Sequence, residues 1–174
     1  MRLDQLVCVD EFGAATNLQR THGRAPPGER VVSFVPHGRW KMISTIAAMT
    51  TRGVVASCSF DGATDTDTFV AFVEDGLVRA LRPGDVGVMD NLAPHKAPAV
   101  RRAIESAGAM LLLLLPYSPD YNPIEMAFSK VKGVLRSMAR RTVDGLFAAI
   151  GVALARVTPD DARSYIKHCG YGLE

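Results

Sequence analysis

Strand-like segments come first along this chain, and helical segments alternate with strands only afterwards. Four short apolar runs follow one another with only loops or turns between them, at 5–12, 31–35, 41–49 and 54–60. Strands joined directly, without helices, favour antiparallel pairing. The first third of the chain therefore predicts an antiparallel meander that is interrupted by a long polar loop at 13–30.

The rest of the chain alternates between the helical and the strand periodicity. Helices are expected at 64–81, 97–108, 123–141, about 143–157 and from Pro159 after the N-cap Thr158, and strands at 85–90 and 109–116. Helices that connect strands imply crossovers and parallel pairing. The complete order predicts an α/β fold built on a mixed sheet, in a single domain over 1–174.

Length and composition limit the class of protein. The 174 residues, 48% of them apolar, suit one domain with a sizeable core. Arginine exceeds lysine, which suits phosphate contacts, although a GC-rich genome explains it equally well. Cys8, Cys58 and Cys169 show no paired spacing, which argues against a zinc knuckle or a disulfide framework. Without a signal peptide or a bilayer-length apolar run, a soluble cytoplasmic protein with no membrane contact is expected.

The stretch LPYSPDYNPIE, residues 115–125, connects the end of the last strand to the start of a helix. Asn122 is a favoured N-cap residue and Pro123 suits the first helical position, so Glu125 becomes the third helical residue. Asn-x-x-Glu is also a variant of the capping box, in which the glutamate only reaches back to the backbone N–H of the cap. A structural and a functional role for Glu125 both fit this pattern.

The helix that begins here carries one polar face beside its apolar stripe. Glu125, Ser129, Lys132 and Arg136 recur at steps of four, three and four residues. Lys132 and Arg136 are candidate DNA-binding residues, because a basic face can contact a phosphate backbone. A helix face that is simply solvated would show the same spacing.

Two further acids follow apolar strands. Asp10 ends the run LVCV and Asp90 ends the run VGVM. If these strands and the helix start at Glu125 meet at one edge of a sheet, three carboxylates cluster there and repel one another unless cations neutralise them. Carboxylate oxygens suit Mg²⁺ or Mn²⁺. A pair of such ions supports phosphoryl transfer. Each aspartate also fits the simpler interpretation of a loop residue that begins to contact water.

Several motifs together give a family resemblance. The segments VDEFG, VMDNLAPHK and LPYSPDYNPIE, in this order, resemble the catalytic domain of DDE transposases of the mariner superfamily, and in particular its bacterial insertion-sequence branch. The 34 residues between Asp90 and Glu125 match the spacing of that branch. The resemblance implies a ribonuclease H-like fold with a mixed five-stranded sheet flanked by helices.

The resemblance also implies the reaction and its site. Asp10, Asp90 and Glu125 would be the catalytic, metal-binding triad, with two Mg²⁺ or Mn²⁺ ions. Glu11 would point to the opposite face of its strand. The enzyme would cut DNA at terminal inverted repeats, and the freed 3′-hydroxyl would attack target DNA at a TA dinucleotide.

Three more residues are candidate auxiliaries of that site, and a fourth is a candidate DNA contact. His95 would touch the scissile phosphate or a metal-bound water, or else only pack its turn. Asn91 would orient Asp90 or form an Asx turn. Asn122 is the third auxiliary residue, and Lys96 is a candidate phosphate contact.

Partners follow from the same resemblance. The loop 13–30, with Arg20, Arg24 and Arg30, occupies the position of a clamp loop, so a homodimer or a DNA contact is expected. Helix-turn-helix modules precede the first aspartate in full-length members, and they are expected to come from an upstream reading frame. The alternative function is a catalytically silent fragment that dimerises with an intact transposase and inhibits it. Either form would be bacterial, and nucleoid-associated when bound to DNA.

Overall fold

The protein, in a computed structural model that describes residues 2–34, 36–116 and 118–172, folds around a five-stranded mixed sheet. The strands are β1 (Leu6–Ala15), β2 (Met42–Thr50), β3 (Gly53–Asp61), β4 (Val86–Met89) and β5 (Met110–Leu113). Their order across the sheet is β3-β2-β1-β4-β5. β1, β2 and β3 pair antiparallel, whereas β4 and β5 continue the sheet in parallel with β1. The predicted change from a meander to crossovers is confirmed.

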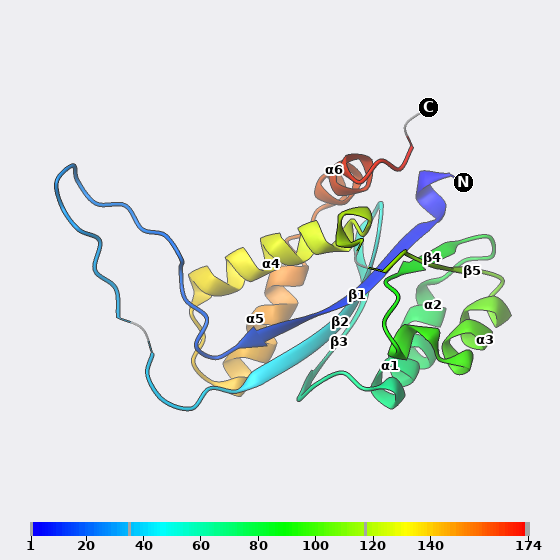
Figure 1. The fold of residues 1–174 in the computed structure, drawn as a ribbon, viewed down its shortest axis with the longest axis horizontal. Coiled ribbons are helices and arrows are strands. Elements are labelled where there is room, and N and C mark those ends of the chain that lie inside the picture. The colour runs from blue at the N-terminus through cyan, green and yellow to red at the C-terminus, as the bar shows by residue number, and fades with distance from the viewer. Residues whose placement is uncertain (1, 35, 117, 173–174) are drawn as a thin grey trace.

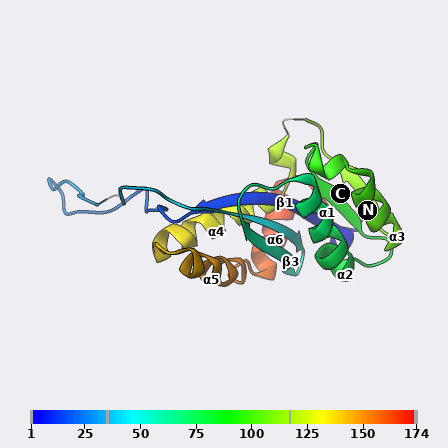
Figure 2. The same cartoon turned by 90° about the horizontal axis from the view of Figure 1, so that it is seen from below.

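Helices cover both faces of this sheet (Figures 1 and 2). They are α1 (Thr66–Phe72), α2 (Val78–Ala80), α3 (Pro98–Ser106), α4 (Ile124–Met138), α5 (Val143–Leu154) and α6 (Pro159–His168). A π-helical turn, Val73–Leu77, joins α1 to α2. α4, α5 and α6 pack on one face, and the segment from α1 to α2 packs with α3 on the other. No helix of the described residues has both the length and the apolar character needed to cross a membrane.

The alternation of side chains along β1 divides the interior into two cores. Leu6, Cys8 and Phe12 belong to the core under α4, α5 and α6, whereas Val7 and Val9 belong to the core under α1 and α3. Both sets are almost completely buried, so β1 is a central strand that is apolar on both faces. Any polar side chain on β1 must therefore find a partner or an opening.

The apolar stripe of α4 is buried as the sequence predicts. Ile124, Phe128, Val131 and Leu135 are each at most 2% exposed. Phe128 packs its ring against Phe12 of β1, with 4.7 Å between the ring centroids. The aromatic pair fixes the height and rotation of α4 over β1. It thereby also fixes where the first turn of α4 lies.

The predicted strand at 31–35 is wrong. Residues 16–34 and 36–41 form a long, largely exposed arm that projects from the body (Figure 1). Val32 and Phe34 are 77% and 92% exposed, and Val35 lies outside the described residues. β2 already pairs with β1 on one side and β3 on the other. The outer edges of β3 and β5 have no partner strand among the described residues, so a missing edge does not explain this result. The run lies on an arm that leaves the sheet, and β-propensity alone does not make a strand.

Ala139 offers a test of local backbone strain at the end of α4. It is the only non-glycine residue among those described with a positive φ, at 49°. The left-handed conformation costs a non-glycine residue about 1–2 kcal/mol, and glycine adopts it freely at the cost of about 0.5–1 kcal/mol more backbone entropy on folding. Ala139→Gly is therefore expected to raise the free energy of unfolding by up to about 1 kcal/mol, as measured by urea denaturation.

Ala127→Gly is the matched control on the same helix. Ala127 is buried in the interior of α4, so the same substitution there should lower stability by about 1 kcal/mol or more. Equal signs for the two variants would contradict this explanation.

Candidate active site

Asp10 occupies the middle of β1 rather than its end, which corrects the prediction that it closes a strand. β2 pairs with β1 as far as Ala15, but β4 pairs only with residues 6–8. Beyond Cys8 the β4 side of β1 is therefore open. Asp10 lies at this opening, on the same face as Cys8 and Phe12, and is only 7% exposed. The early end of β4 thus creates space beside a buried carboxylate.

Asp90 follows the last residue of β4, as predicted. Its carboxylate is about one third exposed. The Oδ1 atom accepts a hydrogen bond of 3.0 Å from the backbone N–H of Leu92 and pairs with Nδ1 of His95. Among the described residues no hydrogen bond engages Oδ2. One oxygen of Asp90 is therefore held in place and the other is available to a ligand.

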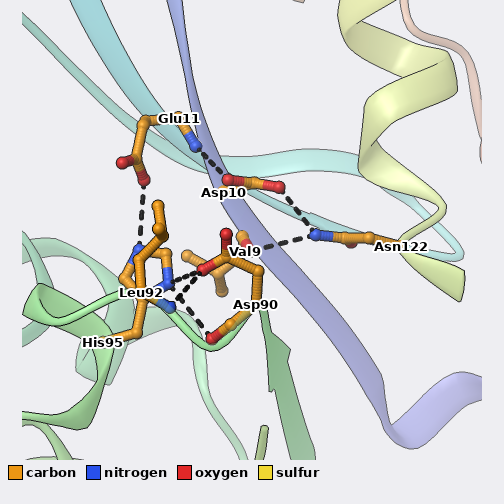
Figure 3. A network of polar contacts seen from close by, with 7 residues as sticks. All are labelled: Val9, Asp10, Glu11, Asp90, Leu92, His95 and Asn122. Atoms are coloured by element: carbon orange, nitrogen blue, oxygen red, sulfur yellow. Dashed lines mark hydrogen bonds and ion pairs between the residues drawn. The ribbon is translucent and has the colours of Figure 1, made fainter. Parts of the chain in front are cut away.

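The corner before α4, residues 118–123, does not form the predicted helix cap. α4 begins at Ile124, Pro123 takes the cap position, and neither Asn122 nor Glu125 makes the side-chain bond of a capping box. The side chain of Asn122 instead donates from Nδ2 to Oδ2 of Asp10 at 2.9 Å (Figure 3). The structural alternative for Glu125, the capping box, is thus not formed. The stiff corner holds Asn122 against β1. Tyr117, within the same motif, lies outside the described residues.

All three candidate acids line one cavity of about 310 Å³. Its remaining walls come from the turn after β4, the end of β5 and the corner before α4. The lining consists of Asp10, Asp90, Asn91, Leu92, Leu114, Leu115, Pro116, Ser118, Pro119, Asn122 and Glu125. A second, more open cavity of about 770 Å³ adjoins it and shares Pro119, Asn122 and Glu125. Glu125 therefore stands between two connected hollows.

The three carboxylates that line this cavity repel one another. Burial, with smaller contributions from the charges of Asp90 and Glu125, raises the pKa of Asp10 to about 7, against the lowering effect of the hydrogen bond from the backbone N–H of Glu11. The coupling to both other acids places the three carboxylates in one electrostatic environment. Such a set is stabilised by a bound cation.

His95 lies behind the acids rather than in the cavity. Its side chain has no exposed surface, and its ring packs 4.2 Å from that of Phe69. Nε2 contacts Oε2 of Glu11 at 3.1 Å, and Nδ1 contacts Asp90. Burial lowers the pKa of His95, but the hydrogen bonds to Asp90 and Glu11 outweigh it and raise that pKa to about 9. Burial raises the pKa of Asp90, but the contact with His95 acts in the opposite direction, and the pKa of Asp90 is lowered.

The predicted contact of His95 with a phosphate or a metal-bound water is therefore not possible in this arrangement, since a side chain without exposed surface cannot reach either. The alternative, a histidine that packs its turn, describes its placement better. The ion pairs with Asp90 and Glu11 are an addition that the sequence did not indicate.

The other candidate residues are distributed more widely. Asn91 lines the cavity, but among the described residues its side chain makes no bond to Asp90, which is oriented by His95 and Leu92 instead. Lys96 is exposed, and its charge helps to lower the pKa of Asp90. Lys132 and Arg136 lie further along α4, outside the cavity, and Nζ of Lys132 stands 5.9 Å from the centre of the Phe12 ring.

The donor set fits a divalent cation by its chemistry. Carboxylate oxygens are the ligands that Mg²⁺ and Mn²⁺ prefer, and the raised pKa of Asp10 reflects first its burial and then the negative charges of Asp90 and Glu125. Oδ1 of Asn122 is buried and finds no hydrogen-bond partner among the described residues. No three His, Cys, Asp or Glu side chains within 2–34, 36–116 and 118–172 form a ready-made metal cluster. The site is thus an acid-lined cavity and not a closed coordination shell.

Comparison with known protein families decides the relationship. A model of the DDE superfamily endonucleases matches residues 5–145. The chain belongs to this family. The match begins just before Asp10 and ends beyond Glu125, so the segments that form the cavity all lie within it. No curated protein sequence matches this DDE endonuclease.

Solved structures show the same fold. A pre-cleavage Mos1 transpososome matches 99% of this DDE endonuclease and 58% of its own chain, at 18% identity and a TM-score of 0.72. A Mos1 mariner paired-end complex with Mn matches 99% of this chain and 58% of its own, at 21% identity and a TM-score of 0.73. A Mos1 transposase catalytic domain with Raltegravir and Mg matches 99% of this chain and 87% of its own, at 17% identity and a TM-score of 0.65.

These matches confirm the ribonuclease H-like fold with its mixed five-stranded sheet. The chain spans a little over half of the Mos1 chains in the DNA assemblies. Assignment to the bacterial insertion-sequence branch stays a prediction.

Glu11 is the residue of the site whose role sequence reasoning missed. It points to the face opposite Asp10, as expected, and for that reason received no role. In the structure that face carries His95, which connects Glu11 to Asp90 (Figure 3). The available signal was an acid on the apolar face of a central strand, since a buried carboxylate requires a partner.

Proposed function

We propose that this DDE endonuclease is the catalytic domain of a transposase that cuts and joins DNA with divalent metal ions. One observation carries the proposal: carboxylates from β1, from the end of β4 and from the first turn of α4 line a single cavity. The structural relatives include Mos1 catalytic domains in the presence of Mg and of Mn. The substrate proposed for the present chain is DNA, with the metal Mg²⁺ or Mn²⁺.

Asp10, Asp90 and Glu125 are the proposed catalytic and metal-binding residues. A pair of bound ions would supply activation of the attacking oxygen and stabilisation of the leaving oxygen in phosphoryl transfer. The chain prepares two of the ligands in advance. Asn122 orients Asp10, and His95 together with the N–H of Leu92 orients Asp90. Glu125 is exposed and has the rotamer freedom to complete the site.

The surroundings of the cavity support a nucleic-acid substrate. Lys96 is exposed near Asp90, and Lys132 and Arg136 continue the polar face of α4 beyond Glu125. We propose these three cations as phosphate contacts. The adjoining larger cavity, which shares Glu125, leaves room for the strand on one side of the cut.

The proposal extends to partners that the cavity itself does not involve. The arm, residues 16–34 and 36–41, exposes Val32, Phe34 and Trp40, and exposed apolar side chains of this kind are suited to contact a second copy of the chain. Terminal inverted repeats and a TA target are the proposed DNA, recognised with helix-turn-helix modules in addition to the 174 residues. The proposed setting is the bacterial cytoplasm. The oriented aspartates favour this enzyme over the silent fragment.

Metal removal tests the proposal. Incubation of the chain with supercoiled plasmid DNA and Mn²⁺ is expected to give nicked circles on an agarose gel. EDTA should stop the reaction, because the acids by themselves provide no group that activates water, and added Mn²⁺ should restore it. Nicking that continues at full rate in EDTA would contradict a metal-dependent site.

A further inference from the structure

Glu11 is linked to both aspartates of the site, to Asp10 directly through its main chain and to Asp90 through its side chain and His95. Its backbone N–H donates to Oδ1 of Asp10 at 2.8 Å. Its Oε2 lies 3.1 Å from Nε2 of His95, whose Nδ1 contacts Oδ1 of Asp90 (Figure 3). Asp10 and Asp90 come from different strands and are 80 positions apart in the sequence. Glu11 therefore connects the two acids across the sheet.

The connection runs through a side chain that cannot move freely. His95 is completely buried and packs against Phe69 on α1. Among the described residues, Glu11 is the only group that engages Nε2 of His95. Without it, the ring is held at one nitrogen only and can tilt about its contact with Phe69. The direction of the bond to Asp90 would then no longer be fixed.

The backbone around Asp90 does little to fix the direction of its carboxylate, so Asp90 depends on side-chain contacts for its orientation. It follows β4 directly, outside any helix or strand, and precedes the bend at Asn91 and the 3₁₀ turn Pro94–Lys96 that carries His95. The ring of His95 and the N–H of Leu92 both engage Oδ1, which directs Oδ2 toward the cavity. Outer groups of this kind orient metal ligands and are commonly required for tight binding.

We propose that Glu11 is a positioning residue that sets the direction of Asp90 through His95 and so fixes the spacing of the two aspartates. It contacts neither DNA nor ion. This inference rests on the proposed function, since it assigns Glu11 a part in preparing the same metal site.

Mn²⁺ binding to the whole chain, measured by isothermal titration calorimetry in the absence of DNA, tests the inference apart from catalysis. Glu11→Met and Glu11→Gln form the informative pair, because they are similar in length and only glutamine keeps an acceptor oxygen for Nε2. Val7→Ala is the control for general loosening, since Val7 is buried on the same face of β1 and lies outside the contacts of His95. Glu11→Ala, in which water can reach the ring, replaces the methionine variant if that variant is unfolded in a thermal melt.

The expected result is that Glu11→Met weakens Mn²⁺ binding about 10- to 100-fold, whereas Glu11→Gln and Val7→Ala bind within about threefold of the original chain. Equal binding by Glu11→Met and the original chain would overturn the inference alone. Equal weakening by Val7→Ala, or by Glu11→Gln, would also overturn it, because loosening or charge would then be the cause. Absence of Mn²⁺ binding by the original chain would instead overturn the proposed function, and this inference with it.

Discussion

Asp90→Asn, Asp10→Asn and Glu125→Gln are each expected to lower metal-dependent nicking by about 10³-fold or more. Each substitution removes one negative oxygen from the cavity, and the electrostatic stabilisation supplied by a catalytic metal is worth several kcal/mol, or about a factor of ten for each 1.4 kcal/mol. The measurement is the initial rate of plasmid nicking in saturating Mn²⁺. Retention of full activity by all three variants would contradict the triad.

Two exposed acids outside the cavity provide matched controls. Asp67 lies in the first turn of α1 and Glu74 in the π-helical turn that follows it, and both are exposed. Asp67→Asn and Glu74→Gln make the same chemical changes and should keep the nicking rate within about twofold, since neither lines the cavity. A comparable loss in these controls would point to net charge rather than to a site.

Asp10→Asn should also stabilise the metal-free chain, which separates loss of function from unfolding. The raised pKa of Asp10 means that its ionised form is disfavoured by folding, on the order of 4 kcal/mol at pH 8. Asparagine removes that charge but can keep only one of the two hydrogen bonds, from Asn122 and from the N–H of Glu11, at a cost of about 1 kcal/mol. The charge effect is the larger, so the variant should be inactive and yet melt at a higher temperature in EDTA.

How far the sequence predicts the structure depends on whether a feature is local. The stripe from Ile124 to Leu135 repeats at the helical period, so the buried face of α4 could be predicted, and the cap Thr158 with Pro159 is found as expected. The run at 31–35 has the composition of a strand, but residues 31–34 lie on the exposed arm and pair with no strand, although β3 and β5 each have an outer edge without a partner among the described residues. Composition alone does not decide whether such a run reaches the sheet.

In the candidate site, too, the local features could be predicted from the sequence and the contacts across the fold could not. Asp10, Asp90 and Glu125 could be selected because each stands at a change of local pattern. The partners of these acids could not, because they depend on contacts across the fold. Asn122 has the properties of an N-cap, yet its side chain bonds to Asp10, 112 positions away. His95 and Glu11 lie 84 positions apart and meet only because the turn after β4 packs against β1.

The metal-free chain should lose stability steadily as the pH rises from about 4 to about 9. Asp10 is an acid whose pKa is raised on folding, from 3.8 to about 7, so the folded state binds more protons than the unfolded state between these values and stability falls as pH rises. His95 is a base whose pKa is raised from 6.5 to about 9, so its contribution is complete below pH 6.5 and is lost as pH passes 9. The expected losses are on the order of 4 kcal/mol for Asp10 and 3 kcal/mol for His95. Urea denaturation in EDTA at one-unit steps of pH measures them.

Two variants separate the overlapping windows. Asp10→Asn should flatten the profile between about pH 4 and 7 and leave the upper part, whereas His95→Gln should flatten the part between about pH 6.5 and 9. The lowered pKa of Asp90 contributes only in more acidic solution, where its stabilising charge is lost as pH falls, so it does not disturb either window.

A stability profile that is level from pH 5 to 9 would mean that neither Asp10 nor His95 is held as the structure has it. A slope that survives unchanged in both variants would assign it to other groups. Asp10 and His95 do not contact each other directly and are linked only through Glu11 and Asp90. The two effects should therefore be close to additive in the double variant, and a large departure from additivity would measure the coupling through these two acids.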